Sequence, residues 1–237
     1  MIYLFDLDNT LISTDRIKDR LYSLAERHGY SAAEAKEIYA EARTIGTWNT
    51  ISLARYAEVL QDHLQRDGKA YHTNLEEEVR TSLEHDNNLL LPGVEKFLQN
   101  CLVKQVRKIL LSLGATEWQQ EKIRWSGLDK YFSAEHGEIV FTQLEGEGKI
   151  EAIKHIFGDE FEGAGIVLFN DKPDETREIL TAFPKMRAQV RRETKDYRYN
   201  EADFMRLRED FGDRLEVFED WSLLGNREGI EGGLVKL

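Results

Sequence analysis

The sequence predicts an α/β protein in which a doubly wound parallel sheet is interrupted by an inserted all-helical domain. The chain opens with the apolar run IYLF at residues 2–5, which suits a buried strand. Helical periodicity then extends from about residue 13 to residue 87. Beyond it, apolar runs alternate with helical patterns, as they do in parallel sheets that helices cover on both faces.

The inserted segment contains four stretches in which apolar residues recur every three or four positions, the spacing of amphipathic helices. Their members are Ile17, Leu21, Leu24 and Ala25; Ala35, Ile38 and Ala42; Leu53, Ala57, Leu60 and Leu64; and Leu75, Val79 and Leu83. We therefore predict an all-helical domain over residues 13–87, and a core domain formed by residues 1–12 and 88–237.

The core domain repeats a strand-helix pattern after the insert. Apolar runs that suit strands lie within residues 106–115, 138–142, 165–171, 186–192 and 215–219, and helical patterns lie within residues 94–100, 117–128, 149–157 and 173–183. Because most of these strands are apolar on both faces, the pattern favours a Rossmann-like sheet.

Composition limits the class of protein. The 237 residues carry a formal net charge of −12, which disfavours binding to nucleic acid. Cys101 is the only cysteine, so no internal disulfide can form, as is usual in a reducing cytoplasm. The sequence shows no basic leader and no apolar stretch of membrane-spanning length. We expect a soluble cytoplasmic protein without nucleic-acid or membrane partners, and its oligomeric state stays open.

One stretch departs from this acidic balance. Residues 185–198, KMRAQVRRETKDYR, hold six basic side chains. One interpretation is a strand and loop whose charges are solvated. The other is a rim that faces an anion near the active site.

Reactive groups follow three of the expected strands. Asp6 follows the first strand, Ser112 stands at the end of ILL, and Asp171 ends VLFND. Lys149 opens a helix between the last two of these strands. Ligands of open parallel sheets bind beyond the carboxyl ends of the strands, so these four groups are expected at one edge.

These motifs resemble those of the haloacid dehalogenase-like hydrolase superfamily. The resemblance rests on DLDNT, on Ser112 after ILL, on Lys149 and on VLFND, and it extends to about residue 183. The helical insert is similar to the C1-type cap of that family. PGVEKFL and GLDKYF are also similar to connecting stretches of its phosphatase branches. The resemblance implies hydrolysis of a small phosphorylated metabolite.

The resemblance also implies a role for each motif residue. Asp6 would attack phosphorus and form an aspartyl-phosphate. Asp8 would protonate the leaving group and then deprotonate water. Mg²⁺ would lie between Asp6, Asp171 and the backbone carbonyl of Asp8. Ser112 and Lys149 would bind the phosphoryl group and offset its charge.

Three supporting positions are less clear from the sequence. Thr10 is expected to support the turn after Asp8. Lys122 and Lys154 are alternatives to Lys149 for the phosphate-binding lysine, since all three lie on expected helices near the site.

The last motif departs from the family pattern, which has an acid or glycine where Asn170 stands. Glu175 takes the place of a later acidic or amide residue. Asn170 is expected either to bind a metal-bound water, which would weaken metal affinity relative to an acid, or to cap the following turn.

Other functions compete with the phosphatase. A dehalogenase is disfavoured because such enzymes lack an acid at the position of Asp8. A phosphomutase, or a catalytically silent binding protein on the same scaffold, stays open. A phospho-receiver module is disfavoured because it has no long helical insert. Trp48, Tyr39 and Tyr56 are candidates to face the substrate, although packing inside the insert is the alternative.

Overall fold

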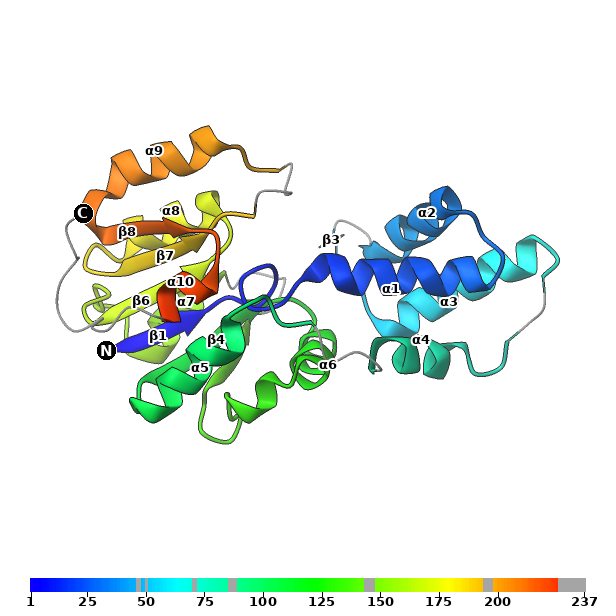
Figure 1. The fold of residues 1–237 in the computed structure, drawn as a ribbon, viewed down its shortest axis with the longest axis horizontal. Helices are drawn as coiled ribbons and strands as arrows, with labels where there is room; N and C mark the ends of the chain where they lie inside the picture. The colour runs from blue at the N-terminus through cyan, green and yellow to red at the C-terminus, as the bar shows by residue number, and fades with distance from the viewer. Residues whose placement is uncertain are drawn as a thin grey trace.

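The computed structural model describes residues 1–45, 48–49, 51–69, 72–84, 89–142, 148–193 and 198–225. Figure 1 shows two parts, a sheet with helices around it and a helical unit to which α1 leads. The sheet consists of β1 (Ile2–Phe5), β4 (Arg107–Leu113), β5 (Ile139–Thr142), β6 (Ile166–Asn170), β7 (Arg187–Arg191) and β8 (Leu215–Phe218). These strands lie in the order β5-β4-β1-β6-β7-β8, and every pair is parallel.

This order confirms the predicted doubly wound α/β fold. From β1 the chain first builds the sheet towards β5, and it later returns to the other side of β1 to add β6. The order therefore reverses between β1 and β6, and the crevice at such a switch point is where ligands of these sheets bind.

Helices cover both faces of the sheet, as the apolar strands require. Alternate side chains of β1 point to opposite faces: Tyr3 and Phe5 belong to one apolar cluster and Leu4 to the other. The first cluster includes α5 (Val94–Val103), α6 (Thr116–Ser126) and α10 (Trp221–Gly225), and the second includes α7 (Lys149–Phe157), α8 (Pro173–Ala182) and α9 (Glu201–Phe211). The described part of the core also contains the short 3₁₀ helices η1 (Leu128–Lys130) and η2 (Gly212–Arg214).

The described residues of the insert form four helices: α1 (Thr14–Arg27), α2 (Ala32–Arg43), α3 (Leu53–Arg66) and α4 (Leu75–Glu84). All the apolar positions that predicted them are buried. The insert is not entirely helical, however, because β2 (Thr44–Ile45) pairs with β3 (Trp48–Asn49) in an antiparallel arrangement. The sequence TIGTWNT at residues 44–50 is rich in β-branched and aromatic residues, which favour strands over helices.

The two chain segments that join the insert to the core lie side by side. The backbone nitrogen of Ser13 donates to the carbonyl of Leu89 over 2.9 Å, and the nitrogen of Leu91 donates to the carbonyl of Leu11 over 2.9 Å. The connection is therefore a short antiparallel pair. None of the described helices combines the length and the apolar character needed to cross a membrane.

The family resemblance did not cover the residues beyond position 183, but these residues belong to the core. Their clearest contribution is Trp221, which is buried and stacks on Phe169 with ring centroids 5.2 Å apart. Its indole nitrogen donates to the carbonyl oxygen of Thr10 over 2.8 Å. The C-terminal part of the chain thereby holds the loop that follows β1.

We expect Trp221→Phe to lower the free energy of unfolding by about 1–3 kcal/mol, because the buried Thr10 carbonyl loses its indole donor. Trp125→Phe is the matched control. The indole nitrogen of Trp125 is buried without a hydrogen-bond partner among the described residues, so this change removes no hydrogen bond. Urea unfolding measures both variants, and equal losses would contradict the role given to the Trp221 hydrogen bond.

Candidate active site

Three predicted site residues meet at the switch point of the sheet. Asp6 follows β1, Asp171 follows β6, and Ser112 lies near the end of β4. The backbone nitrogen of Asp6 donates to the carbonyl of Phe169 over 2.9 Å, which continues the pairing of β1 with β6. All three side chains are buried. The expected convergence at one edge of the sheet is what the structure shows.

The carboxylate of Asp6 has a donor on each oxygen. The hydroxyl of Thr10 donates to Oδ2 over 2.9 Å, and Nζ of Lys149 donates to Oδ1 over 2.6 Å. Thr10 is fully buried. The sequence predicted that Thr10 supports the turn after Asp8, but it did not indicate this contact with the Asp6 carboxylate. These two contacts fix the orientation of the Asp6 carboxylate.

The loop between Asp6 and α1 is held by its own side chains and by the C-terminal strands. Asn9 has a φ of 57°, a left-handed conformation that asparagine tolerates well. Its Oδ1 accepts from the backbone nitrogen of Thr14 (3.2 Å) and from the Thr14 hydroxyl (2.6 Å). Nη1 of Arg191 donates to the Asn9 carbonyl over 2.8 Å. The loop that presents Asp8 is thus anchored at its turn.

Lys149 is buried between two carboxylates. Its Nζ lies 2.6 Å from Asp6 Oδ1 and 2.6 Å from Glu175 Oε2. Burial alone would lower the pKa of Lys149, but the two carboxylates raise it above its ordinary value, so the ammonium is retained. The alternative Lys154 is ion-paired with Glu151 on the outer surface of α7.

Asn170 uses its whole side chain to organise the turn after β6. Its Oδ1 accepts from the backbone nitrogen of Asp171 over 3.0 Å. Its Nδ2 donates to Glu175 Oε2 over 2.9 Å and to the Thr176 hydroxyl over 3.1 Å. Of the two interpretations from the sequence, this geometry favours the one in which Asn170 supports the turn.

Glu175 is held ionised by these neighbours. Burial would raise the pKa of Glu175, but Lys149 and Lys172 together with the Asn170 hydrogen bond keep it below its ordinary value. Glu175 therefore acts as the counter-charge that positions Lys149 against Asp6.

We expect Asn170→Asp to destabilise the protein by about 1–3 kcal/mol, because a carboxylate cannot donate to Glu175 and instead repels it. Thr176→Val is a control that removes the neighbouring acceptor without adding charge. Thermal denaturation at matched Mg²⁺ concentrations compares the two. A rise in stability for Asn170→Asp would show that position 170 faces a cation instead.

Asp171 presents a carboxylate oxygen that has no hydrogen-bond partner in the part of the chain that the structure describes. Its Oδ1 is buried and accepts no hydrogen bond from any described residue, and Oδ2 lies 3.6 Å from Nη2 of Arg198. Burial, followed by repulsion from Asp6, raises the pKa of Asp171 to about 8. A cation beside Asp6 and Asp171 would remove this penalty.

The donor set fits a magnesium ion. Mg²⁺ prefers oxygen ligands and usually takes one or two carboxylates, with water and substrate phosphate as its other ligands. Among the described residues no group of three acidic, histidine or cysteine side chains forms a ready-made metal site. Asp6 and Asp171 supply two carboxylates at neighbouring strand ends, and the buried Oδ1 of Asp171 accepts no hydrogen bond from the described residues, which fits Mg²⁺.

The carboxylate of Asp8 forms an ion pair with Lys122, which the sequence suggested as an alternative phosphate-binding lysine. Nζ of Lys122 lies 2.6 Å from both carboxylate oxygens of Asp8, and Nε2 of Gln119 donates to Oδ2 over 3.5 Å. Burial would raise the pKa of Asp8, but Lys122 and Gln119 hold it below its ordinary value. Gln119 and Lys122 are three residues apart on α6, so they share one helix face.

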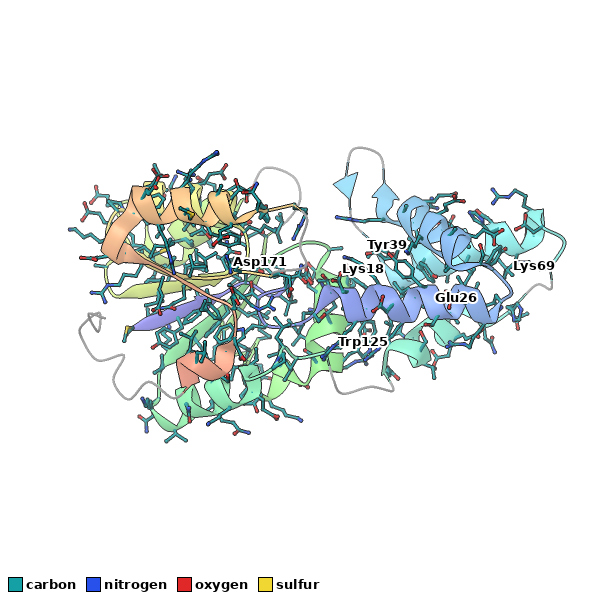
Figure 2. The ribbon with its side chains drawn as sticks, turned by 45° about the horizontal axis from the view of Figure 1, so that its top comes forward. Lys18, Glu26, Tyr39, Lys69, Trp125 and Asp171 are labelled. Atoms are coloured by element: carbon teal, nitrogen blue, oxygen red, sulfur yellow. The ribbon has the colours of Figure 1, made fainter. Side chains whose placement is uncertain are left out.

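A pocket of about 330 Å³ opens over this site, between the core and the insert. Figure 2 shows Lys18 and Tyr39 in the insert and Asp171 in the core. Asp6, Asp8 and Asp171 line the pocket, whereas Ser112 and Lys149 are buried and are not among its lining residues. The remaining lining residues are Asn9, Thr14, Asp15, Ile17, Lys18, Tyr39, Arg43, Ile51, Leu113, Gly114, Trp118, Gln119, Lys122, Lys172, Glu193 and Arg198.

The aromatic candidates of the insert differ in their surroundings: one lines the pocket and one packs inside the insert. Tyr39 lines the pocket. Tyr56 is fully buried, and its hydroxyl donates to the Leu21 carbonyl over 2.5 Å, so it packs inside the insert. The side chain of Trp48 lies outside the described part of the structure.

The described basic side chains of residues 185–198 lie in different surroundings. Lys185 and Arg192 form ion pairs with surface acids. Arg198 lines the pocket next to Asp171. Arg198 thus lies where the rim was expected, whereas the binding of an anion there stays a prediction, and Lys195 lies outside the described residues.

The family of the chain follows from a match in sequence. A sequence model of the haloacid dehalogenase-like hydrolases matches residues 1–174, most of the chain. The chain belongs to the haloacid dehalogenase-like hydrolases. Members of this group are described as hydrolases, and the edge-of-sheet carboxylates lie inside the matched part. No curated protein matches this hydrolase in sequence.

Solved structures share the fold of this hydrolase at low sequence identity. A protein assigned as a haloacid dehalogenase-like hydrolase from Burkholderia xenovorans is 19% identical, with 94% of each chain covered and a TM-score of 0.63. A protein assigned as a β-phosphoglucomutase from Thermotoga maritima is 16% identical, with 95% of this chain and 96% of that chain covered and a TM-score of 0.58. The L-2-haloacid dehalogenase of Xanthobacter autotrophicus is 11% identical, with 94% and 96% covered and a TM-score of 0.52.

Proposed function

We propose that this hydrolase is a Mg²⁺-dependent phosphatase that hydrolyses a small phosphorylated metabolite through an aspartyl-phosphate on Asp6. The observation that carries the proposal is the environment of the Asp6 carboxylate. Thr10 and Lys149 orient it, and at the adjacent strand end lies the Asp171 oxygen that has no hydrogen-bond partner among the described residues. This arrangement suits a nucleophile that shares a cation with a second carboxylate.

In the first step Asp6 attacks phosphorus and the bond to the leaving oxygen breaks. Lys149 offsets negative charge on Asp6 and on the phosphoryl group, with Ser112 as a hydrogen-bond donor at the end of β4. Mg²⁺ held by Asp6, Asp171 and the carbonyl of Asp8 would supply electrostatic stabilisation of the phosphoryl oxygens.

Asp8 is the group proposed to move protons. Lys122 and Gln119 hold the pKa of Asp8 below its ordinary value, so Asp8 is a carboxylate in the free site and must take up a proton from solvent before it can act as an acid. The negative charge of the bound phosphate favours this uptake, and Asp8 then passes the proton to the leaving oxygen. In the second step the Asp8 carboxylate accepts a proton from the water that attacks the aspartyl-phosphate, which releases phosphate and frees Asp6. Phosphate-monoester hydrolysis is very slow without such help.

Asp8 also argues for phosphatase over dehalogenase activity. A halide leaves as a stable anion and needs no proton, whereas an alkoxide leaving group does. The fold likeness to a dehalogenase and to a phosphoglucomutase assignment does not choose between these reactions. The acid at position 8, with a lysine to tune it, supports phosphoester chemistry.

We further propose that residues 13–87 act as a C1-type cap on a core of residues 1–12 and 88–237. The pocket has lining residues on α1 and α2 as well as on the core, which supports a substrate held between the two. Closure of such a lid would exclude water and complete the site.

Steady-state assays with p-nitrophenyl phosphate and with 2-chloropropionate, each with Mg²⁺ and with EDTA, test the proposal. We expect phosphate release that depends on Mg²⁺ and no halide release. Halide release without phosphate release would indicate a dehalogenase. A stoichiometric burst without turnover would indicate a phosphomutase, and no reaction with either compound would indicate a silent binding protein.

A further inference from the structure

We propose that the substrate carries a carboxylate on its leaving group, and that Lys18, Tyr39 and Arg43 of the insert bind this carboxylate. This inference rests on the proposed function, because it assigns the phosphoryl group to the Asp6 side of the pocket. It adds the substrate class, a phosphorylated hydroxy acid.

The three side chains belong to the part of the pocket wall that the insert supplies, together with Thr14, Asp15, Ile17 and Ile51. Lys18 comes from α1, and Tyr39 and Arg43 come from α2. Tyr39 and Arg43 are four residues apart, so they lie on the same face of the helix. Figure 2 shows Lys18 and Tyr39 on neighbouring helices of the insert.

These groups present hydrogen-bond donors and positive charge. Arg43 is exposed and forms no ion pair with an acid in the described part of the chain. Nζ of Lys18 lies 2.7 Å from Asp15 on the same helix, a pair that is open to solvent. Burial raises the pKa of Tyr39 to about 12, so its hydroxyl stays protonated and can donate.

The acids of the core domain that line the pocket already lie beside other basic side chains. Asp6 is paired with Lys149, Asp8 with Lys122, and Asp171 lies near Arg198. Glu193 at the pocket rim is paired with Arg191. Arg43 therefore adds a positive charge that the described acids leave unmatched, in a protein whose net charge is −12.

The geometry of the donors favours a carboxylate. A guanidinium presents its N–H groups as a flat fork that matches the two oxygens of a carboxylate. Tyr39 adds a neutral donor on a ring held against Tyr22, with centroids 5.4 Å apart. The pocket of about 330 Å³ is at the small end for ligand sites, which suits a compact substrate with both anionic groups close together.

Matched substrates test the inference. Phosphoglycolate carries the second anion, 2-hydroxyethyl phosphate is its neutral counterpart, and phosphoethanolamine carries a positive charge instead. We expect kcat/KM to favour phosphoglycolate over 2-hydroxyethyl phosphate by about 10-fold or more, the effect of a charge-assisted hydrogen bond. Phosphoethanolamine should be the poorest of the three.

Variants assign that preference to the insert. Arg43→Gln should lower the ratio of the two kcat/KM values by about 10-fold or more. Lys36→Gln removes a cation from the same helix that does not line the pocket, and it should leave the ratio unchanged. An absent preference, an unchanged ratio in Arg43→Gln, or faster turnover of ethylene glycol bisphosphate than of phosphoglycolate would each overturn the inference.

A binding measurement separates this inference from the proposed function. In an Asp6→Asn background, calorimetry should give tighter binding of phosphoglycolate than of 2-hydroxyethyl phosphate, and Arg43→Gln should remove the difference. If wild-type protein hydrolyses no phosphomonoester while this binding difference persists, the phosphatase proposal fails and carboxylate recognition stands. If hydrolysis occurs without the binding difference, carboxylate recognition fails.

Discussion

Replacing Asp6 with asparagine is expected to reduce turnover of a phosphomonoester by at least about 10⁴-fold, the scale of losing a nucleophile. An amide cannot form the acyl phosphate. It can still accept one hydrogen bond, but it offers Lys149 no charge. The loss should appear in kcat, because the positive groups that bind substrate are retained.

Asp19→Asn is the matched control for this change, since Asp19 is exposed on α1 and does not line the pocket. It should keep wild-type kcat. Intact-mass analysis excludes deamidation of the Asp6→Asn protein during the assay. Appreciable turnover by verified Asp6→Asn would remove Asp6 from the role of nucleophile.

Lys149→Met is expected to have the largest effect on stability. The change leaves the carboxylates of Asp6 and Glu175 buried without the ammonium that lies 2.6 Å from each. Removing one partner of a buried ion pair costs about 3–5 kcal/mol. Turnover should also fall by about 10²-fold or more, because the charge on the phosphoryl group is no longer offset.

Two comparisons make the Lys149 result specific. Lys154→Met removes a partly exposed lysine from the same helix, and its free energy of unfolding should change by less than about 1 kcal/mol. Adding Glu175→Gln to Lys149→Met should restore part of the lost stability, since one unpaired carboxylate is then neutral. Equal losses for the two lysine variants, measured by urea unfolding, would contradict the buried network.

The sequence predicted most elements of the fold because their signals are local. The helical stripes of the insert and the apolar strands of the core depend on residues a few positions apart. The pairing of β2 with β3 was missed because each strand has only two residues, too few for a periodic pattern. The predicted convergence of Asp6, Ser112 and Asp171 followed from the general geometry of parallel sheets.

Contacts between distant residues could not be predicted in this way. Lys122 and Asp8 are 114 positions apart, and Trp221 and Thr10 are 211 positions apart. Periodicity tells which face of an element is buried but not which distant polar group it meets. For the same reason the sequence left open whether Lys122, Lys149 or Lys154 serves the site. Only the packing of α6 and α7 on the sheet separates them.

The central claim is that Asp6 carries the phosphoryl group during turnover, and its most direct test is acid quenching of a single turnover with phosphoglycolate and Mg²⁺, followed by peptide mass spectrometry. We predict a phosphoryl group on Asp6 at short times, lost as phosphate is released, and absent without Mg²⁺. Release of phosphate with no phosphorylated peptide at any time, or a phosphoryl group on a residue other than Asp6, would contradict the mechanism.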